Sequence, residues 1–242
     1  MKKQSGYREL AKYYDLIYSQ KDYKKEVKKI AKLISKYKKS NWKELLDIAC
    51  GTGNHIQFLI EKFVCTGIDM SKEMLDVARK KIKNVKLKKT NMINFKINKK
   101  FDIITCLFSA IGYVKTYENL RKTINNFALH LKTGGIVIIE PWFNKSTYKA
   151  GFPHITTYES KDLKIARLCV SKVKNNISIM DMNYLIAERN KEVKYFIDRH
   201  ELGLFEIDKT LQIMKEAGLK SKFLKNGLTK DRGLYVGIKD KQ

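Results

Sequence analysis

The 242-residue sequence lacks the features of membrane and secreted proteins. It contains no run of about eighteen apolar residues, which excludes a membrane-spanning helix. Its first ten residues, MKKQSGYREL, lack the apolar segment of a secretory signal. The four cysteines form no CxxC pair, and no His, Cys, Asp or Glu cluster has metal-ligand spacing, so neither a disulfide framework nor a metal site is expected. Buried free thiols in a reducing cytoplasm account for the cysteines.

Arginine is scarce, although the chain is strongly basic. Only seven of the 50 basic residues are Arg, and the lysines are scattered over nearly every segment of a chain with a formal net charge of +25. Specific readers of bases and phosphates tend to use Arg for its bidentate geometry. A nucleic-acid partner is therefore disfavoured, whereas a positive field favours an anionic small substrate. An RNA-directed binding protein is the alternative from another functional class.

The segment ELLDIACGTGNHIQFLIEKFVCTGIDM, residues 44–70, has the order strand, glycine loop, helix, strand and acid. A short apolar run bounded by glycine predicts a buried parallel strand. Gly51 and Gly53 allow a tight turn and let a ligand lie against the backbone. A helix is expected next, because apolar residues recur at helical spacing from Ile56 to Phe63, and a second apolar strand from Val64 ends at Asp69. This order predicts a nucleotide-type site at the carboxyl ends of parallel strands.

The loop lacks the third glycine of a dinucleotide fingerprint, because Ile56 occupies that position, and this argues against NAD or FAD. The first strand instead carries Asp47 near its end, and a carboxylate close to the loop suits a cationic amino group. Asp69 suits a ribose, since its two oxygens can accept from both vicinal hydroxyls. A ligand that joins an amino acid to a nucleoside describes S-adenosylmethionine. The alternative is that both carboxylates only cap turns or form salt bridges.

The remaining periodicity predicts an α/β fold with a seven-stranded, mostly parallel, doubly wound sheet. We expect helices within residues 7–40, a helix that begins after an N-cap at Ser71, and a helix over 207–217. A further helix is expected over 120–131, with Gly134 and Gly135 ending it. We expect an edge strand at 85–90, further strands at 101–108 and 136–140, and a closing antiparallel hairpin within 219–238. The tyrosines near residue 14 either pack on the core or place phenol groups over a ligand.

Residues 143–205 lose helical periodicity, and segments near 154–172, 176–188 and 191–203 alternate in polarity. We expect an antiparallel β insertion that forms a lid or substrate floor. The whole chain is then a single domain, residues 1–242, whose core comprises residues 1–142 and 206–242.

Several stretches resemble a known family: YYDLIYSQKDYKKE, LLDIACGTGNH, FSAIGYVKT, LKTGGIVIIEPWF, DRHELGLF and DRGLYVG. The chain resembles class I S-adenosylmethionine-dependent methyltransferases, which have a Rossmann-like fold. More narrowly, it is similar to N,N-dimethyltransferases that act on TDP-linked amino sugars, as in desosamine and mycaminose biosynthesis. The resemblance implies a cytoplasmic enzyme that methylates the amine of a nucleotide sugar, and a homodimer is compatible with it. A glycine-type amine or an oxygen acceptor is the alternative substrate.

Candidate site residues follow from the motifs and from the resemblance. The candidate cofactor-binding residues are Tyr14, Asp47, Ala49, Gly51, Gly53, Asp69, Met70, Asn91, Met92 and Phe108. The candidate substrate-binding residues are Tyr18, Ser109, Trp142, Tyr148 and Arg232, the last for a pyrophosphate. Family members usually have Asp where Asn91 stands, so an acceptor oxygen is kept and a charge is lost. A plain turn asparagine is the alternative reading of Asn91.

Methyl transfer to nitrogen requires an amine that arrives neutral, so a proton acceptor is useful. Tyr113 and His200 are the candidate catalytic residues, and His154 is a further candidate base, because imidazole titrates in the right range. The alternative for each lone His is a satisfied structural group.

Overall fold

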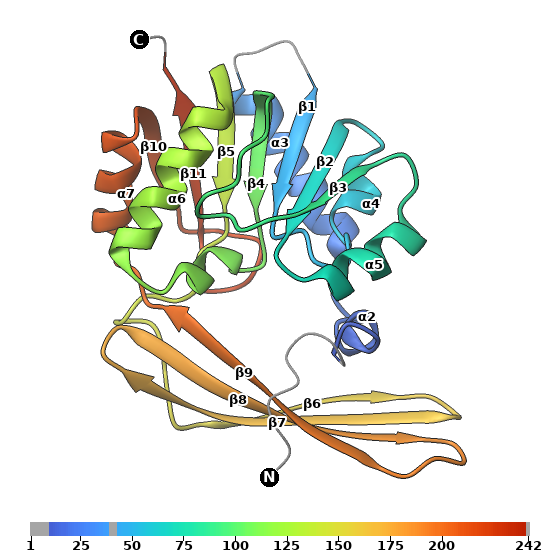
Figure 1. The fold of residues 1–242 in the computed structure, drawn as a ribbon. Coiled ribbons are helices and arrows are strands. Elements are labelled where there is room, and N and C mark those ends of the chain that lie inside the picture. Colours follow the sequence, from blue (N-terminus) through green and yellow to red (C-terminus); the bar gives the residue numbers. More distant parts are fainter. Residues whose placement is uncertain (1–9, 39–42, 241–242) are drawn as a thin grey trace.

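The computed structural model describes residues 10–38 and 43–240, and a sheet of seven strands lies at its centre (Figure 1). Expectations for residues 1–9 and 39–42 lie outside the described residues. The strand order is β10-β11-β5-β4-β1-β2-β3. The strands are β1 Glu44–Ile48, β2 Val64–Asp69, β3 Lys86–Lys89, β4 Phe101–Cys106, β5 Leu131–Ile139, β10 Leu219–Leu224 and β11 Leu234–Lys239.

The first five strands run parallel, and β11 pairs antiparallel with both β5 and β10. The mostly parallel seven-stranded sheet is therefore confirmed, as is its terminal hairpin. The lysine-rich strand β3 lies at the sheet edge. Lysine on an edge strand discourages pairing with another chain.

Helices cover both faces of the sheet, because each carries one apolar stripe. On one face lie α3 Tyr23–Tyr37, α4 Ile56–Leu59 and α5 Lys72–Lys81, and their buried residues form one core with β1 and β5. On the other lie α6 Tyr117–His130 and α7 Ile207–Glu216 (Figure 1). Ser71 caps α5 as expected, its hydroxyl accepting from the Met74 N–H at 3.2 Å.

Two expectations for local structure are wrong. The helix after the glycine loop is the single turn α4, although we expected its apolar spacing to extend to Phe63. Gly134 and Gly135 do not end α6, which stops at His130, but lie within β5. The register of β4 against β5 shifts between Phe101 and Ile103, and a Cβ on Gly135 would lie 2.8 Å from a carbonyl oxygen. The glycines therefore accommodate a β-irregularity.

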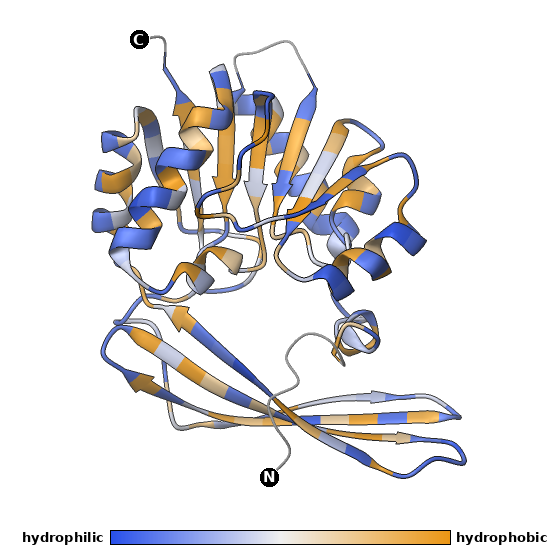
Figure 2. Ribbon diagram, in the orientation of Figure 1, coloured by the Kyte–Doolittle hydropathy of each residue, from blue (hydrophilic) through white to orange (hydrophobic). Residues whose placement is uncertain are grey.

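The segment between β5 and α7 forms a second, antiparallel sheet with the order β6-β7-β8-β9. Its strands are β6 Pro153–Glu159, β7 Leu163–Lys174, β8 Ile177–Glu188 and β9 Lys194–Gly203. The expected strand 154–172 is two strands, because the chain turns at residues 160–162, where the Ser160 N–H donates to the Leu163 carbonyl at 2.9 Å. Apolar and polar residues alternate along these strands (Figure 2).

The antiparallel sheet lies across the carboxyl ends of the parallel strands, and helix α2, Tyr14–Ile17, lies between the two sheets (Figure 1). Hydrogen bonds tie this N-terminal segment to both sheets. The Tyr13 hydroxyl donates to Glu188 on β8, and the Asp15 carboxylate accepts from Thr52 of the glycine loop at 2.6 Å. Among the described helices, none is both long and apolar enough to cross a membrane.

Candidate active site

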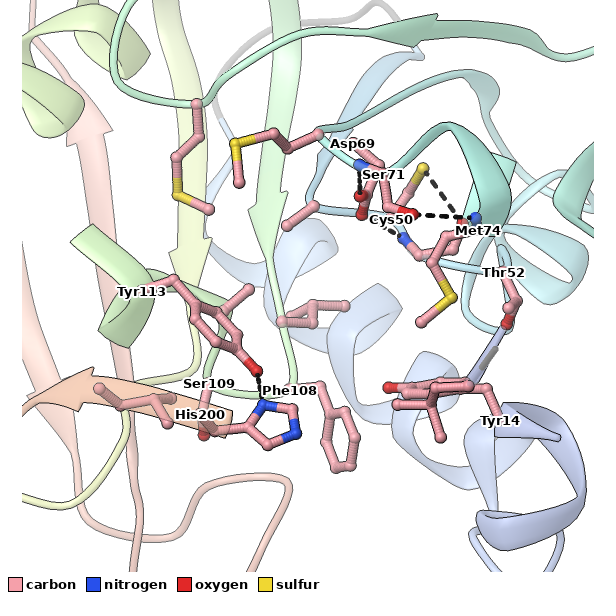
Figure 3. A pocket seen from close by; sticks show the side chains of 18 of the residues that line it. Tyr14, Cys50, Thr52, Asp69, Ser71, Met74, Phe108, Ser109, Tyr113 and His200 are labelled. Atoms are coloured by element: carbon pink, nitrogen blue, oxygen red, sulfur yellow. Dashed lines mark hydrogen bonds between the residues drawn. The ribbon is translucent and has the colours of Figure 1, made fainter. Parts of the chain in front are cut away.

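A cavity of about 1170 Å³ lies where the carboxyl ends of the parallel strands meet the antiparallel sheet (Figure 3). Its walls come from α2, the glycine loop, the ends of β1, β2 and β4, and strands β7 to β9. Sites for one drug-sized ligand enclose about 300–1,000 Å³. The volume therefore accommodates a cofactor and a substrate together.

Asp69 is oriented by two backbone groups at the end of β2. Its Oδ2 accepts from the Gly51 N–H and its Oδ1 from the Ser71 N–H, both at 2.8 Å. Burial raises the pKa of Asp69, while these backbone donors lower it. Each carboxylate oxygen has a second lone pair, so holding the loop and binding a ribose are compatible roles.

The two loop glycines serve different purposes. Gly51 has φ +55°, and a Cβ there would meet nothing within 4 Å, which leaves the space beside it free for a ligand. Ala49, with φ 54°, also lines the cavity. Gly53 lies outside the cavity lining, and a Cβ there would approach the Ile82 Cδ1 to 2.1 Å. Gly53 therefore allows the loop to pack on the end of α5.

Asp47 is an acid buried at the floor of the cavity. It is 2% exposed, and its Oδ1 accepts from the Thr105 hydroxyl at 2.7 Å. Burial raises its pKa to about 6, although His55 and the Thr105 hydroxyl lower it. A buried carboxylate with one hydrogen-bond donor gains from a cationic partner, such as the amino group of a ligand.

The other candidate cofactor residues line the same cavity: Tyr14, Met70, Asn91, Met92 and Phe108. The Asn91 Oδ1 accepts from the Ile93 N–H at 3.0 Å, so Asn91 stabilises a turn. It also lines the cavity. Burial raises the pKa of Tyr14 well above its ordinary value, which keeps this phenol protonated as a hydrogen-bond donor.

The proposed substrate end is built around Arg232, on the loop between β10 and β11. Its Nη1 donates to the Ser109 hydroxyl at 3.1 Å, and its guanidinium lies 4.5 Å from the centre of the Trp142 ring. Burial lowers the pKa of Arg232. Tyr18 lines the cavity too, its hydroxyl accepting from Arg167 at 2.8 Å. A cation held by rings and hydroxyl groups is suited to binding an anion.

Two candidates lie away from this end. Tyr148 is not among the residues that line the cavity and packs against the rings of Trp142 and Phe143, 6.0 and 5.9 Å between ring centres. His154 is exposed on β6. Tyr148 therefore supports the aromatic residues beneath Arg232 from outside the cavity.

Tyr113 and His200, far apart in sequence, meet in the cavity (Figure 3). The Tyr113 hydroxyl and the His200 Nδ1 are 2.6 Å apart, and the His200 Nε2 lies 3.1 Å from the Asp198 Oδ2. Asp198 is 3% exposed. The Nε2–Oδ2 contact lies at ion-pair distance without hydrogen-bond geometry, so Asp198 acts on His200 through its charge. A nearby negative charge favours the proton on Nε2, which leaves Nδ1 to accept from the Tyr113 hydroxyl.

The sequence interpretation missed Asp198 and the side chains that β7 and β8 contribute. Asp198 and His200 are two residues apart on one strand, so they share a face, and this period-2 spacing was the available signal. Arg167 lines the cavity and also donates to Thr156 at 2.7 Å. Nothing in the local sequence marks Arg167 as a cavity residue. Of the four cysteines, three are buried free thiols and Cys50 is partly exposed at the cavity.

Comparisons with known proteins agree with this geometry. A methyltransferase-domain family model matches residues 45–135. The chain is 34% identical over 231 residues to the dTDP-3-amino-3,4,6-trideoxy-alpha-D-glucopyranose N,N-dimethyltransferase of Streptomyces venezuelae, covering 94% of this chain and 97% of that protein. The crystal structure of Streptomyces venezuelae DesVI superimposes with a TM-score of 0.89 at 33% identity, covering 94% of this chain and 97% of the other.

The fold extends to more distant proteins. SAM-bound CalS10, an amino pentose methyltransferase from Micromonospora echinaspora, superimposes with a TM-score of 0.84 at 24% identity, covering 99% of this chain and 100% of the other. The full-length match to the Streptomyces enzyme decides the family. The chain belongs to the class I S-adenosylmethionine-dependent methyltransferases and, within them, to the family of TDP-amino-sugar N,N-dimethyltransferases.

Proposed function

We propose that the protein transfers methyl groups from S-adenosylmethionine to the amino group of a TDP-linked amino sugar. One observation carries the proposal: a single cavity unites the glycine loop and Asp69 with Arg232 and the Tyr113–His200 pair. The Streptomyces venezuelae relative, at 34% identity, is named for a dTDP-linked amino sugar. The cavity offers an acid at one end and an arginine at the other, as a cationic cofactor and an anionic substrate require.

The chain has the groups to hold the cofactor. Asp69 presents its carboxylate for the ribose, Asp47 for the amino group of the methionine part, and Gly51 leaves space against the backbone. When bound, S-adenosylmethionine supplies a methyl group activated by a neighbouring sulfonium. Holding two reactants in line contributes about 7–11 kcal/mol in well-oriented systems.

The chain also provides a route for the proton that the amine must lose. With Nδ1 of His200 as acceptor, the Tyr113 hydroxyl donates to it, and Tyr113 lines the cavity. An amine proton can be taken up by the Tyr113 oxygen while the hydroxyl proton passes to His200. Asp198 stabilises the imidazolium that results. Tyr113 and His200 are thus the proposed catalytic residues, and Asp198 positions His200.

We further propose a single domain in which residues 143–205 are an insertion that supplies the substrate floor, and a cytoplasmic location. Free thiols at all four cysteines agree with a reducing compartment. Substrate-floor residues such as Arg167 and His200 come from this insertion.

We also propose a homodimer formed through the outer face of the antiparallel sheet. Apolar side chains cover that face, among them Ile155, Leu168, Val170, Leu185 and Tyr195, which are 44–66% exposed. Four strands about 4.8 Å apart and on average about 10 residues long present about 650 Å², somewhat below the roughly 800 Å² that each partner buries in a stable dimer.

Charge favours a second copy as the occupant of this face. The guanidinium of Arg199 forms two hydrogen bonds with the Asp181 carboxylate, at 2.6 and 2.7 Å, so the charges of this pair cancel. Two copies of a chain with a net charge of +25 repel each other over most of their surface. Lys172 also acts on the Asp181 carboxylate, so this face is mainly apolar and weakly charged, and repulsion between two copies is weaker here than over a lysine-covered surface.

The function is tested by incubating purified protein with S-adenosylmethionine and a set of TDP-amino sugars. Mass spectrometry should show the gain of one and then two methyl groups, and S-adenosylhomocysteine should form in equal amount. Turnover of glycine or another small amine, with none on any TDP-amino sugar, would reassign the substrate. Tight, salt-sensitive RNA binding without methyl transfer would favour the RNA-directed alternative.

A further inference from the structure

Glu140 is a buried acid for which the proposed chemistry has no use. It follows β5 directly, is 0% exposed, and is not among the residues that line the cavity. Its Oε2 accepts from the Phe108 N–H at 2.7 Å, and its Oε1 accepts from the Thr229 hydroxyl at 2.6 Å. A buried carboxylate is tolerated only when its oxygens are satisfied, so both partners matter. One side chain thereby joins the turn after β4 to the loop at residues 225–233.

The turn that Glu140 holds has a strained backbone. Phe108 and Ser109 have φ values of 51° and 61°, which lie in the left-handed region that residues other than glycine rarely adopt. Such conformations persist where the surroundings over-determine them, and they cluster at functional sites. Glu140 fixes the Phe108 N–H, and the Pro141 carbonyl accepts from the Ser109 hydroxyl at 2.7 Å.

The loop that Glu140 holds carries Arg232. The loop is tied to Glu140 through Thr229 and to Ser109 through Arg232 itself. The Nε of Arg232 is buried and has no hydrogen-bond partner among the residues that the structure describes. A buried donor without a partner costs stability unless a ligand satisfies it. The guanidinium therefore has donor capacity to spare for an anionic ligand.

We propose that Glu140 is a positioning residue for substrate recognition, which locks the loop at residues 225–233 so that Arg232 stays over Trp142 at the substrate end. This inference rests on the proposed function, since it takes the Arg232 ligand to be the diphosphate of the nucleotide sugar. Glu140 acts through Thr229 and through the Phe108 turn. It contacts neither cofactor nor substrate itself.

The sharpest test is Thr229→Val, which removes one hydroxyl and keeps the shape of the side chain. The KM for the TDP-amino sugar should rise about tenfold, as expected for a lost hydrogen bond to a charged group. The kcat at saturating substrate and the Kd for S-adenosylhomocysteine should change less than about twofold. Asn226→Ala, an exposed change in the same loop, should leave all three values unchanged.

Two Glu140 variants separate charge from hydrogen bonding. Glu140→Gln can accept from the Phe108 N–H with its amide oxygen and donate to a rotated Thr229 hydroxyl, so it should retain most of the substrate affinity. Glu140→Ala loses both bonds and should raise the KM further. Because Thr229 also lines the cavity, a raised KM in Thr229→Val supports the inference only together with faster hydrogen exchange in the loop. If Glu140→Ala does not fold, these two readouts of Thr229→Val decide the inference.

Amide hydrogen exchange gives a readout that needs no substrate. Exchange across residues 225–233 should accelerate in Thr229→Val and stay at the wild-type rate in Asn226→Ala. Unchanged exchange, an unchanged KM, or an equal loss of S-adenosylhomocysteine affinity would overturn the inference. If wild-type protein methylates no TDP-amino sugar, the proposed function fails, whereas the exchange result still decides whether Glu140 holds the loop.

Discussion

At the residue scale, Asp47 shows a conflict between stability and binding. Its pKa is about 6 in the fold and about 4 in an unfolded chain. Between about pH 4 and 6 the folded state therefore binds more protons than the unfolded state, so this group makes stability fall as pH rises. Above about pH 6, the ionised Asp47 carboxylate lowers the free energy of unfolding by a constant amount, about 3 kcal/mol.

We therefore expect Asp47→Asn to stabilise the ligand-free protein. The gain above pH 7 should be about 1–2 kcal/mol, because the lost charge penalty exceeds the cost of one unsatisfied amide N–H. The same change should weaken S-adenosylhomocysteine binding at least about tenfold, since it removes the partner of the ligand's amino group. Denaturant unfolding at pH 5 and pH 8 and calorimetric titration measure both effects. A variant less stable than wild type at pH 8 would contradict this account of Asp47.

The two loop glycines yield a paired prediction. Gly53→Ala should destabilise the fold by about 2–4 kcal/mol, because a positive φ and a clash with Ile82 add together. Gly51→Ala should cost only about 1 kcal/mol of stability, since its Cβ meets open space, yet it should weaken cofactor binding more than Gly53→Ala does. Thermal melts and calorimetry compare the two variants. The reverse order of effects would show that Gly53 is the residue facing the cofactor.

At the element scale, strand β9 presents Asp198 and His200 on one face. His200→Gln and Asp198→Asn should each lower kcat about 100-fold near neutral pH, the lower end of the range for general base catalysis. The loss should shrink at high pH, where the substrate amine is already neutral. Tyr195→Phe, on the opposite face of the same strand, is the matched control. Steady-state kinetics across pH provides the test, and a loss that is equal at every pH would assign the pair a structural role.

The sequence predicted those elements whose signal is local. The strand-loop-helix-strand order around Gly51 and the hairpin that ends with β11 are contiguous patterns, and both are confirmed. The break at residues 160–162 was missed because the polar turn continues the alternation of the strands around it. Gly134 was misplaced because a glycine marks a helix end and a β-irregularity alike.

The candidate site divides in the same way. Asp47 and Asp69 could be assigned roles because they flank the glycine motif in the chain. Arg167 and His200 reach the cavity, and Asp198 acts there through His200, only because the second sheet folds across the first, and no local pattern encodes that packing. Tyr148 follows Trp142 across a turn at residues 145–147, where its N–H donates to the Asn144 carbonyl at 3.0 Å. This turn packs the Tyr148 ring against Trp142 outside the cavity lining, which the sequence does not show.

At the scale of the whole molecule, the antiparallel sheet has two apolar faces. The inner face buries Tyr184 and Phe196, whose rings stack at 4.8 Å, against the N-terminal segment. The outer face, with Leu168 and Leu185, has no covering layer among residues 10–38 and 43–240. Apolar sheet faces are normally covered by another layer, and a patch of this size on a monomer marks an interaction site.

We therefore expect wild-type protein to sediment as a dimer at micromolar concentration. The double variant Leu168→Lys, Leu185→Lys should sediment as a monomer, because four lysines would enter the interface of two copies without anionic partners. Leu129→Lys adds a charge at a leucine that is 68% exposed on α6, far from that face, and should remain a dimer. If the wild type is a monomer, or the double variant stays dimeric, this face does not join two copies.

Because His200 and Arg167 lie on the inner face of the same sheet, the monomeric variant also tests whether dimerisation supports the substrate floor. A raised KM for the amino sugar at an unchanged S-adenosylhomocysteine Kd would show that it does.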